Sequence, residues 1–488
     1  LYGLEIDGAQ RVAYAYDALA RQTKKILKLP DEMEYTTSYS YLPGAKEGLT
    51  TNLVSRVENG DAQLDYTYDA LGNIVTISEN GDLKYSYKYD AMNRLIREND
   101  AWENKTICYT YDLGGNLLSQ KTYDYQLGEL SPSESAWEET TYEYTNPDWK
   151  DQLSAYNGEE ITYDAMGNPL NYRGMTLTWR KGRQLESLQK DDGSYLNFVY
   201  NCDGARVQKS EDSANGSTIK ETRYYWNGDQ LMALKDGEDL IQFTYDEKGI
   251  PFSMKIGEDV YYYLYNVQGD VVGLLDSNGV EVVSYRYSSW GKILETVDTS
   301  DNQIAARNPF RYRGYILDEE TGMYYLKSRY YDPETGRFLN ADSTEILEIQ
   351  EDLYDKNLYT YCDADPINRR DAEGSCWQIS GTGGVALMQL GTVGFHFSWN
   401  LLGWGILAFV GIIALGYAGQ QLVKVVKSKR RSKSRSRSKR GTGRPELKKQ
   451  GREEREKKKR QNWIKRSGKK PRKQPRPHHP SKKGHRKY

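Results

Sequence analysis

The chain has 488 residues and a formal net charge of −2, so it is too long for one ordinary core and long enough for a repeat body with appendages. The near-neutral total hides an asymmetry, because the residues after position 420 hold 30 Lys/Arg and 4 Glu, a charge of +26, and the rest carry −28. The only histidines are His396, His478, His479 and His485, and the four cysteines form no Cys-x-x-Cys pair, which excludes His-dependent catalysis from the body and indicates neither a metal site nor a disulfide framework.

The sequence opens on Leu1 without a secretion signal, and we expect it to be part of a longer chain. Tyrosine is unusually common: 42 Tyr stand against 8 Phe, and 40 of those Tyr precede residue 376. Half-buried strands suit such residues, because the ring packs while the hydroxyl stays wet or bonded. The composition predicts a mainly β body that needs no cofactor.

A repeat appears at residues 57–94, where Glu-Asn-Gly-Asp and the Tyr-x-Tyr-Asp-Ala that follows it recur after 21 residues. Between Asn80-Gly81 and Asn93, apolar or aromatic residues alternate with polar ones, which is the period of a strand with two unlike faces. Asn-Gly favours a tight hairpin turn because both positions need positive φ. Each unit therefore predicts one β-hairpin of about twenty residues.

A second kind of turn follows the Tyr-Asp pair of each unit. The Asp can cap the turn with its side chain, and Gly or Asn supplies the left-handed residue. A degenerate copy or an insertion is expected in the long gap from 116 to 163. The copies are YDALGN (68–73), YDAMNR (89–94), YDLGGN (111–116), YDAMGN (163–168) and, more weakly, YNCDGA (200–205) and YDEKG (245–249).

Single hairpins cannot bury their own faces, so neighbours must stack into a continuous sheet. An ordinary β-sandwich with coincidental Tyr-Asp pairs is the alternative, and the shared spacing disfavours it. These copies resemble the YD repeats of bacterial Rhs proteins, of toxin-complex C components and of teneurins. Residues 263–292 and 308–343 resemble the Rhs repeat-associated core, and residues 357–374 resemble its closing segment.

The resemblance covers residues 5–375 and implies a fold. It implies that residues 1–307 form a spiralling, cage-like β-shell and that residues 308–375 form a core domain curled inside it. It further implies a carrier that delivers a C-terminal effector in competition between bacteria. The partners that it implies are an immunity protein and a component of a secretion system.

Self-cleavage at the end of the core is a further implication of the resemblance. The family motif has two Asp-Pro-x-Gly-like segments and an Arg before the first, and the matching positions are Arg337, Asp342 and Asp371. Two carboxylates can act as acid and base if their environments separate their pKa values. The sequence departs from the motif, with Ala341 and Ala372 in places where the motif has other residues. Ion pairing that merely ties the core together is the alternative.

An uncharged stretch follows the core, since residues 374–423 contain no Asp, Glu, Lys or Arg. Residues 376–398 are expected to be a Gly-rich linker. Residues 399–419 are apolar and long enough, at about 20 residues, for a helix that crosses a lipid bilayer. The basic residues after it favour a cytoplasmic tail. A hydrophobic plug inside the cage is the alternative.

The tail is strongly basic. Residues 424–443 are a Lys/Arg/Ser linker with too little apolar matter to fold, and residues 444–488 are a basic module, so we expect a largely disordered tail. It is predicted to bind nucleic acid or an anionic membrane. A nuclease that uses His478, His479 and His485 is the alternative. The residues predicted to contact polyanions are Arg430, Arg431, Arg435, Arg437, Lys457, Lys458, Lys459 and Arg460.

A different function class also fits these features, namely a membrane-anchored surface protein for adhesion or carbohydrate binding. A surface anchor needs only a short basic stop, whereas this tail continues for more than 60 residues past residue 419, which favours the carrier. We expect a protein that a bacterium secretes or holds at its membrane through one spanning segment. Enzymatic activity would be limited to self-cleavage or to a tail nuclease.

Overall fold

The computed structural model describes only part of the chain, and all described residues belong to the first of two compact units, residues 1–399. The predicted spanning segment 399–419 and the basic tail 424–488 lie outside the described residues, as does most of the linker 376–398. Within the described part, no helix is long and apolar enough to cross a membrane. The described ranges are 3–6, 9–46, 48–131, 133–342, 357–375 and 377–379.

The shell is built of antiparallel strands in which neighbours in sequence are neighbours in the sheet, as stacked hairpins require. The first sheet has 14 strands. These are β1 (Gly3–Ile6), β2 (Ala9–Tyr16), β3 (Gln22–Lys28), β4 (Glu34–Pro43), β5 (Thr50–Asn59), β6 (Ala62–Tyr68), β7 (Ile74–Glu79), β8 (Asp82–Tyr89), β9 (Leu95–Asp100), β10 (Lys105–Tyr111), β11 (Leu117–Asp124), β12 (Glu138–Glu143), β13 (Ala155–Tyr156) and β14 (Glu159–Glu160), with the short 3-10 helix η1 (Pro30–Glu32) before β4.

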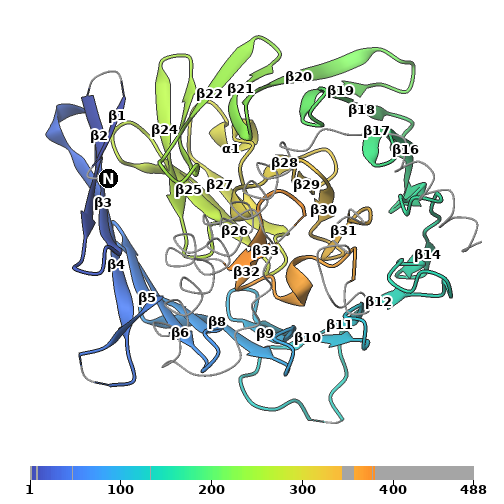
Figure 1. Cartoon of the computed structure of the whole chain (residues 1–488), viewed down its shortest axis with the longest axis horizontal. Coiled ribbons are helices and arrows are strands. Elements are labelled where there is room, and N and C mark those ends of the chain that lie inside the picture. The colour runs from blue at the N-terminus through green and yellow to red at the C-terminus, as the bar shows by residue number, and fades with distance from the viewer. Residues whose placement is uncertain are drawn as a thin grey trace, which may run out of the picture. The chain divides into compact units, whose positions relative to one another are not determined.

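The second sheet continues the same order with 13 strands. These are β15 (Asn171–Tyr172), β16 (Met175–Arg180), β17 (Gln184–Gln189), β18 (Tyr195–Tyr200), β19 (Arg206–Asp212), β20 (Thr218–Asn227), β21 (Gln230–Asp236), β22 (Asp239–Tyr245), β23 (Pro251–Ile256), β24 (Asp259–Tyr265), β25 (Val271–Leu275), β26 (Glu281–Tyr287) and β27 (Ile293–Asp298). Figure 1 shows the strands of both sheets following one another around the gold and orange core elements.

The prediction of one continuous sheet is wrong in one place, because the wall divides between β14 and β15. Only an isolated bridge, Tyr163 to Pro169, lies between the two sheets at this point. Pro169 has no N–H to donate, so a regular ladder cannot continue through it. The hairpin stack itself goes on beyond the break.

Both predicted turn types are confirmed. Asn80 and Gly81 have φ values of 51° and 90° in the tight turn between β7 and β8. In the YD turn after β6, the Asp69 carboxylate accepts N–H bonds from Leu71 at 2.8 Å and Asn73 at 2.9 Å. Gly72 supplies the left-handed residue with φ 87°. The Asp of each such turn is therefore a backbone cap.

In most YD turns the tyrosine hydroxyl bonds the strand before it, whereas Tyr200 bonds Tyr330 of the core. The Tyr68 hydroxyl donates to the Val54 carbonyl at 2.6 Å, and the bond recurs along the wall. Two tryptophans, Trp179 and Trp226, do the same through their indole N–H. Tyr144 confirms a degenerate copy in the gap from 116 to 163. The recurring pairs are Tyr89 with Ile74, Tyr111 with Leu95, Tyr144 with Leu117, Tyr163 with Leu153, Tyr245 with Leu231, Tyr265 with Pro251 and Tyr287 with Val271.

The start of the first sheet packs against the end of the second. One apolar cluster joins the first strands to strands more than 220 residues later in the sequence. The wall therefore overlaps itself, which buries side chains that would otherwise face solvent on a twisted open sheet. The cluster contains Val12, Tyr14, Leu27, Leu29, Phe252, Tyr262, Leu264 and Leu275.

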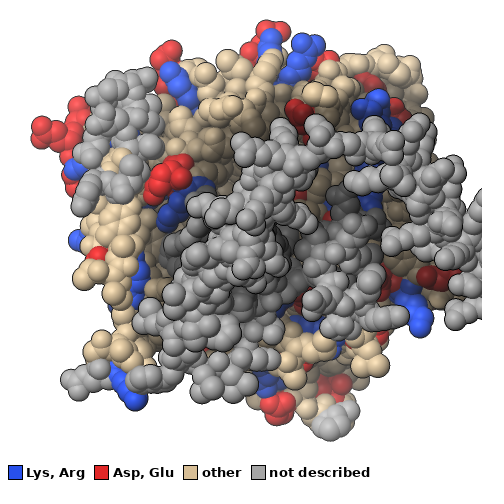
Figure 2. Space-filling model, in the orientation of Figure 1, with Lys and Arg blue, Asp and Glu red and all other residues tan. Residues whose placement is uncertain are grey.

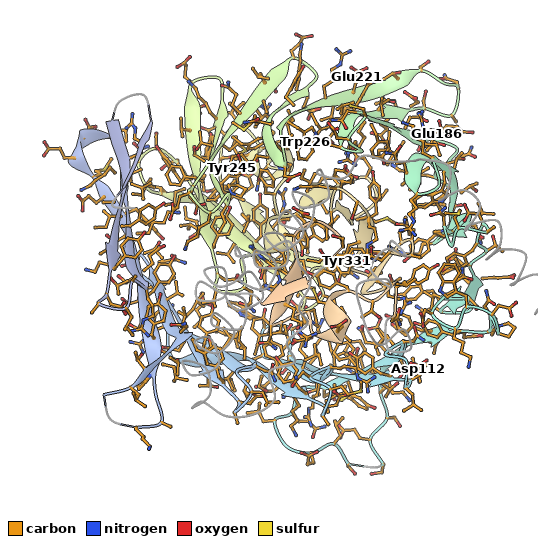
Figure 3. All side chains as sticks on the ribbon, in the orientation of Figure 1. Asp112, Glu186, Glu221, Trp226, Tyr245 and Tyr331 are labelled. Atoms are coloured by element: carbon orange, nitrogen blue, oxygen red, sulfur yellow. The ribbon has the colours of Figure 1, made fainter. Side chains whose placement is uncertain are left out.

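The core is contacted by shell strands that are far apart in the sequence. The Ile74 N–H donates to Asn368, the Tyr172 hydroxyl donates to Asp332, and Arg206 pairs with Asp318. In Figure 3, Tyr331 lies at the centre of the described unit, whereas Glu221 lies on the outer side of the wall. The core elements are α1 (Ile304–Arg307), η2 (Tyr312–Gly314), β28 (Ile316–Asp318), β29 (Met323–Tyr325), β30 (Tyr330–Asp332), β31 (Arg337–Phe338), η3 (Cys362–Ala364), β32 (Arg369–Asp371) and β33 (Trp377–Ile379).

Candidate functional site

Asp371 stands at the end of β32, where the chain reverses before it returns as β33. The side chain of Asp371 is almost fully buried, at 4% exposure. One of its carboxylate oxygens accepts N–H bonds from Gly374 at 2.8 Å and Ser375 at 3.0 Å. The carboxylate therefore caps the turn at residues 372–375. This turn closes the core domain 308–375, and the family resemblance implies self-cleavage at that end, near residues 374–376.

Arg329 brings the two predicted aspartates together. Its Nη2 lies 2.9 Å from Asp342 Oδ2 and 3.5 Å from Asp371 Oδ2. The guanidinium is buried and stacks on the Phe338 ring at 3.5 Å from the ring centroid. Burial lowers the pKa of Arg329, and the two carboxylates act in the opposite direction. Both acids thus face the same cation.

The same arginine also holds the turn itself. Arg329 Nε donates to the Gly374 carbonyl, and Nη1 donates to the Leu358 carbonyl at 2.9 Å. The Ser328 hydroxyl lies 2.6 Å from the Glu373 carbonyl and 2.8 Å from the Gly374 carbonyl. Ser328 and Arg329 therefore donate to the carbonyls of the turn, and Asp371 accepts from its amides.

Gly374 is the residue that lets the turn come this close. Its φ is 75°, in the left-handed region that glycine adopts at little cost. A Cβ at this position would lie 2.7 Å from Ser328 Oγ and 2.9 Å from the Leu326 carbonyl oxygen. Both the backbone conformation and the available space require glycine here.

Arg337, the third predicted residue, contacts the shell. Its guanidinium donates to the Asp151 carbonyl at 2.6 Å and to the Asn116 side chain at 3.4 Å, both in the shell. It also lies over the Tyr144 ring, 5.2 Å from the centroid. Arg337 thus joins the core to the wall, and Arg329 is the arginine that meets both acids. The family motif selected Arg337 because it lies closer to Asp342 in the sequence than Arg329 does, and nothing in the sequence shows that Arg329 meets both acids.

A cysteine next to the site is held as a thiol. Burial raises the pKa of Cys362 well above its ordinary value, and the charge of Asp371 adds to this. A thiolate is needed for nucleophilic attack. The chemistry of this cluster is therefore that of carboxylates and a guanidinium, which can move protons to and from water and a peptide group.

The two acids differ in their access to water. The Asp342 side chain is 13% exposed, against 4% for Asp371. Asp371 is further committed to the turn, because three successive amides, those of residues 373 to 375, lie within 3.3 Å of its Oδ1. Such an asymmetry is what separates the roles of two neighbouring carboxylates.

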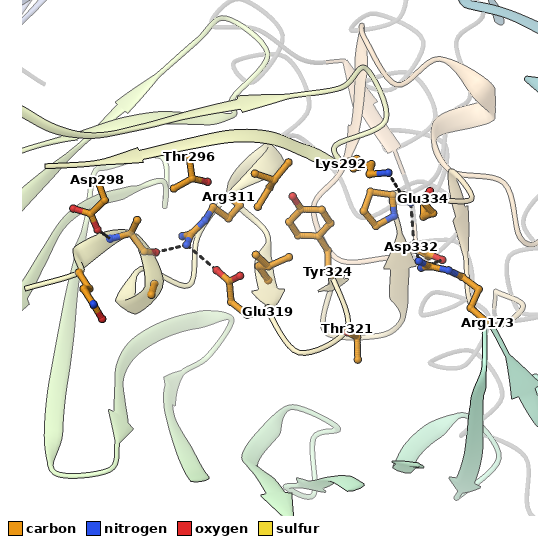
Figure 4. A pocket seen from close by; sticks show the side chains of 17 residues that line it. Arg173, Lys292, Thr296, Asp298, Arg311, Glu319, Thr321, Tyr324, Asp332 and Glu334 are labelled. Carbon is orange, nitrogen blue, oxygen red and sulfur yellow. Dashed lines mark hydrogen bonds and ion pairs between the residues drawn. The ribbon is translucent and has the colours of Figure 1, made fainter. Parts of the chain in front are cut away.

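A second recess, with a volume of about 560 Å³, lies between the wall and the core (Figure 4). Tyr324 and Thr321 lie between charged groups at its two ends. Six of the seven charged side chains in the lining form ion pairs with one another, and the seventh, Asp298, accepts backbone N–H bonds from Ser300 and Ala305. The recess therefore presents no charge that is set aside for an ionic ligand. On the visible part of the face in Figure 2, basic and acidic side chains are likewise interspersed. The pairs in the recess are Arg311 with Glu319, Arg173 with Asp332, and Lys292 with Glu334.

Comparison with known families agrees with this architecture. The family described as Teneurin YD-shell matches residues 232–367, which covers the later shell strands and the core. The family described as RHS Repeat matches residues 68–101, which includes two of the YD turns.

Similar proteins include large bacterial toxins. The tRNA nuclease WapA of Bacillus subtilis (strain 168) is 30% identical over 318 residues, which is 64% of this chain and 13% of WapA. The toxin protein Tse5 of Pseudomonas aeruginosa is 23% identical over 390 residues, which is 69% of this chain and 29% of Tse5. The chain therefore spans less than a third of the length of these relatives.

A solved structure shares the fold. The crystal structure of TcdB2-TccC3-Cdc42 covers 75% of this chain with a TM-score of 0.55 and 18% identity, and the chain covers 21% of it. Stacked YD hairpins around a tyrosine-rich core define a YD-repeat shell protein. This chain belongs to the bacterial Rhs/YD-repeat proteins, as its repeats, its shell match and its relatives together show.

Proposed function

We propose that the chain is the shell and core of an Rhs-type carrier that encloses and delivers an effector region, in competition between bacteria. The proteins WapA and Tse5, to which it is similar, are a nuclease and a toxin by name, which supports a toxin context. An immunity protein and a component of a secretion system are the partners that such a carrier needs. The domain limits 1–307 and 308–375 are part of this proposal.

One observation carries the proposal: Arg329 pairs with both Asp342 and Asp371 and also holds the turn at residues 372–375 through the Gly374 carbonyl. This turn is also where the composition changes, since no charged residue occurs between Gly374 and Val423. A carrier that releases its cargo needs a cut at such a junction. We therefore propose that the core cleaves its own chain in this turn.

The proposed reaction is hydrolysis of a peptide bond at residues 374–376. The two carboxyl groups share one proton, which Asp371 carries before the reaction, while Asp342 is the carboxylate closer to Arg329. Asp342 takes a proton from a water molecule whose oxygen attacks the carbonyl carbon. Asp371 gives the shared proton to the leaving nitrogen as the C–N bond breaks, and Asp342 keeps the proton that came from water. The products are a new carboxylate terminus and a new amino terminus. The Arg329 charge stabilises negative charge near the turn, as a buried cation does for such an intermediate.

Expression of residues 1–488 followed by intact-mass measurement tests this function. The wild-type chain should appear as two fragments that meet within residues 374–376. Asp342→Asn and Asp371→Asn should each leave a single uncut chain, because the proposed reaction needs one carboxyl group as base for the water and the other as acid for the leaving nitrogen. Arg337→Lys is the control and should be cut normally, since Arg337 contacts the wall. Cutting that continues in both aspartate variants would assign it to another protease.

The basic tail is proposed to bind polyanions, and residues 399–419 are proposed to insert into a lipid bilayer as a single span. Replacing all eight predicted contact residues by Ala should weaken binding of the full chain to duplex DNA. These residues are Arg430, Arg431, Arg435, Arg437, Lys457, Lys458, Lys459 and Arg460. Wild-type binding should fall steeply between about 50 and about 200 mM salt, because counterion release drives it. Replacing His478, His479 and His485 by Ala is the control and should leave binding unchanged. Equal binding by both variants would contradict the proposal.

A further inference from the structure

Ser328 occupies the tip of the hairpin between β29 and β30, directly before the arginine that meets both acids. The Ser328 N–H donates to the Leu326 carbonyl at 2.7 Å, and the Leu326 N–H donates to the Arg329 carbonyl at 2.9 Å. Lys327 between them has φ 60°, in the left-handed region. These bonds fix the tip, so the Ser328 side chain faces the turn at residues 372–375 from a rigid support.

The Ser328 hydroxyl has one proton and two carbonyl acceptors. Its oxygen lies 2.6 Å from Glu373 O and 2.8 Å from Gly374 O, both within the range of O–H···O bonds. One hydroxyl can donate to only one of the two carbonyls at a time. The hydroxyl therefore sits where it can hold either carbonyl of the residues that lead to the expected cut.

The Gly374 carbonyl receives a second donor from another side chain, because Arg329 Nε also donates to it. Gly374 in turn lies so close to the tip that a Cβ would meet Ser328 Oγ at 2.7 Å. The two donors and the close packing leave the turn little freedom to slide along the chain direction. A slide of one residue would move a different peptide bond toward Asp342 and Asp371.

We propose that Ser328 is a positioning residue for the self-cleavage, which rests on the proposed function. Its hydroxyl bonds either the Glu373 or the Gly374 carbonyl, while Arg329 bonds the Gly374 carbonyl, and this fixes which peptide bond at residues 374–376 meets the two acids. Ser328 transfers no proton in the reaction and forms no covalent bond. Loss of the hydroxyl relaxes the register, so the cut becomes slower and less uniform, since small misplacements cost large factors in rate.

The test follows cleavage of newly made full-length chain over time in a cell-free translation reaction, with the new amino termini identified by mass spectrometry. Ser328→Ala should slow cleavage by about 10- to 100-fold and should produce more than one new terminus. Ser328→Thr keeps the hydroxyl and should give a single terminus at nearly the wild-type rate. Ser328→Val has the shape of Thr without the hydroxyl and should behave like Ser328→Ala. The Thr and Val variants share any effect of size on folding, so the difference between them isolates the hydroxyl.

The outcomes separate this inference from the function on which it rests. If the wild-type chain is uncut, or if Asp371→Asn is still cut, the self-cleavage proposal and this inference both fail. If the wild type is cut and Asp371→Asn is not, but Ser328→Val gives the wild-type rate and the same single terminus, only the role of Ser328 is overturned. A Val variant that is slow but keeps one terminus also overturns it, because a purely structural loss lowers the rate without shifting the bond.

Discussion

The YD turn at Asp69 and the turn that follows Asp371 share one construction. Each begins Asp-Ala-x-Gly, each Asp caps the amide N–H four residues later, and each Gly has positive φ. They differ in the second carboxylate oxygen. In Asp69 this oxygen accepts a bond from the Asn73 side chain, four residues away. In Asp371 it accepts a bond from Arg329, 42 residues away. The candidate cleavage turn is thus a shell-type turn whose outer oxygen faces a distant, buried cation instead of a local partner.

The same contrast runs through the whole molecule. Ion pairs in the YD turns of the wall are local and partly exposed, as between Asp90 and Arg94. The pairs that fix the core join distant residues and exclude water, as between Arg206 and Asp318. A local pair stabilises one turn, and a buried long-range pair decides whether the core and the wall stay together. The expected effects of mutation follow this division.

The largest effect is expected at Arg206. It is 0% exposed and holds Asp318 through contacts of 2.5 and 2.9 Å. Arg206→Met should lower the free energy of unfolding by about 3–5 kcal/mol, because the Asp318 charge then stays buried with Lys209 as its remaining close cation. Arg94→Met, the local control, should cost about 1 kcal/mol or less. Urea unfolding of both variants measures this, and equal losses would remove the distinction between wall and core pairs.

This division also explains what the sequence could reveal. The Asp caps, the Asn80-Gly81 turn and the β-hairpins were predictable because each depends on residues within about twenty positions. Arg329 and Arg337 lie eight residues apart in one stretch, and only the folded core decides which of them meets the acids. The pairing of Asp342 with Asp371 was predicted from a family motif, since their distance along the chain carries no geometric signal.

Two features of the wall also escaped the sequence pattern. Trp226 takes the role of a YD tyrosine through its indole N–H, which a search for Tyr-Asp does not find. The sheet divides at Pro169, and a proline directly after a YD turn does not by itself show where a long sheet will end. Both features depend on hydrogen-bond donors. An indole N–H can replace the tyrosine hydroxyl, as in Trp226, and Pro169 has no N–H to donate to a ladder.

The next effect concerns a carboxyl group at the seam between the two sheets of the wall, where Glu98 of the first sheet faces Ser289 of the second. Glu98 on β9 is 1% exposed and accepts a bond from the Tyr109 hydroxyl at 3.0 Å. Burial raises the pKa of Glu98 to about 7, whereas its ordinary value is 4.5. The folded state thus binds this proton more tightly than the unfolded chain. Its contribution to stability is complete below pH 4.5 and is lost as the pH rises through about 7.

Urea unfolding at pH 5 and pH 8 should therefore show a loss of about 3 kcal/mol in the wild-type chain as the pH rises. Glu98→Gln has no proton to lose and should remove most of that difference. A wild-type chain of equal stability at both pH values would show that the seam is wetter than the contacts of Glu98 indicate.

Two glycines at equivalent positions test whether the turn after Asp371 is packed more tightly than the YD turn after Asp69. Gly72 and Gly374 occupy the same turn position with φ 87° and 75°. Ala at either position costs about 1–2 kcal/mol for the left-handed backbone. The Cβ at Gly72 would find its nearest atom at 3.9 Å, whereas the Cβ at Gly374 would collide with Ser328 and Leu326. Gly72→Ala should leave self-cleavage unchanged, and Gly374→Ala should suppress it. Mass measurement decides this, and normal cutting of Gly374→Ala would contradict the close fit.

The smallest effect is expected for the hydroxyls that join one hairpin to the next. Tyr68→Phe removes only the donor to the Val54 carbonyl, at 2.6 Å, and should lower the free energy of unfolding by about 1 kcal/mol. Tyr225→Phe is the control, because Tyr225 is 47% exposed and its change should have almost no effect. Because at least eight YD tyrosines make the same bond, small losses should add when distant ones are changed together. A combined Tyr68→Phe and Tyr245→Phe chain that loses no more than either single variant would show that the wall does not depend on these bonds. Additive losses would explain why the wall keeps tyrosine where phenylalanine would pack equally well.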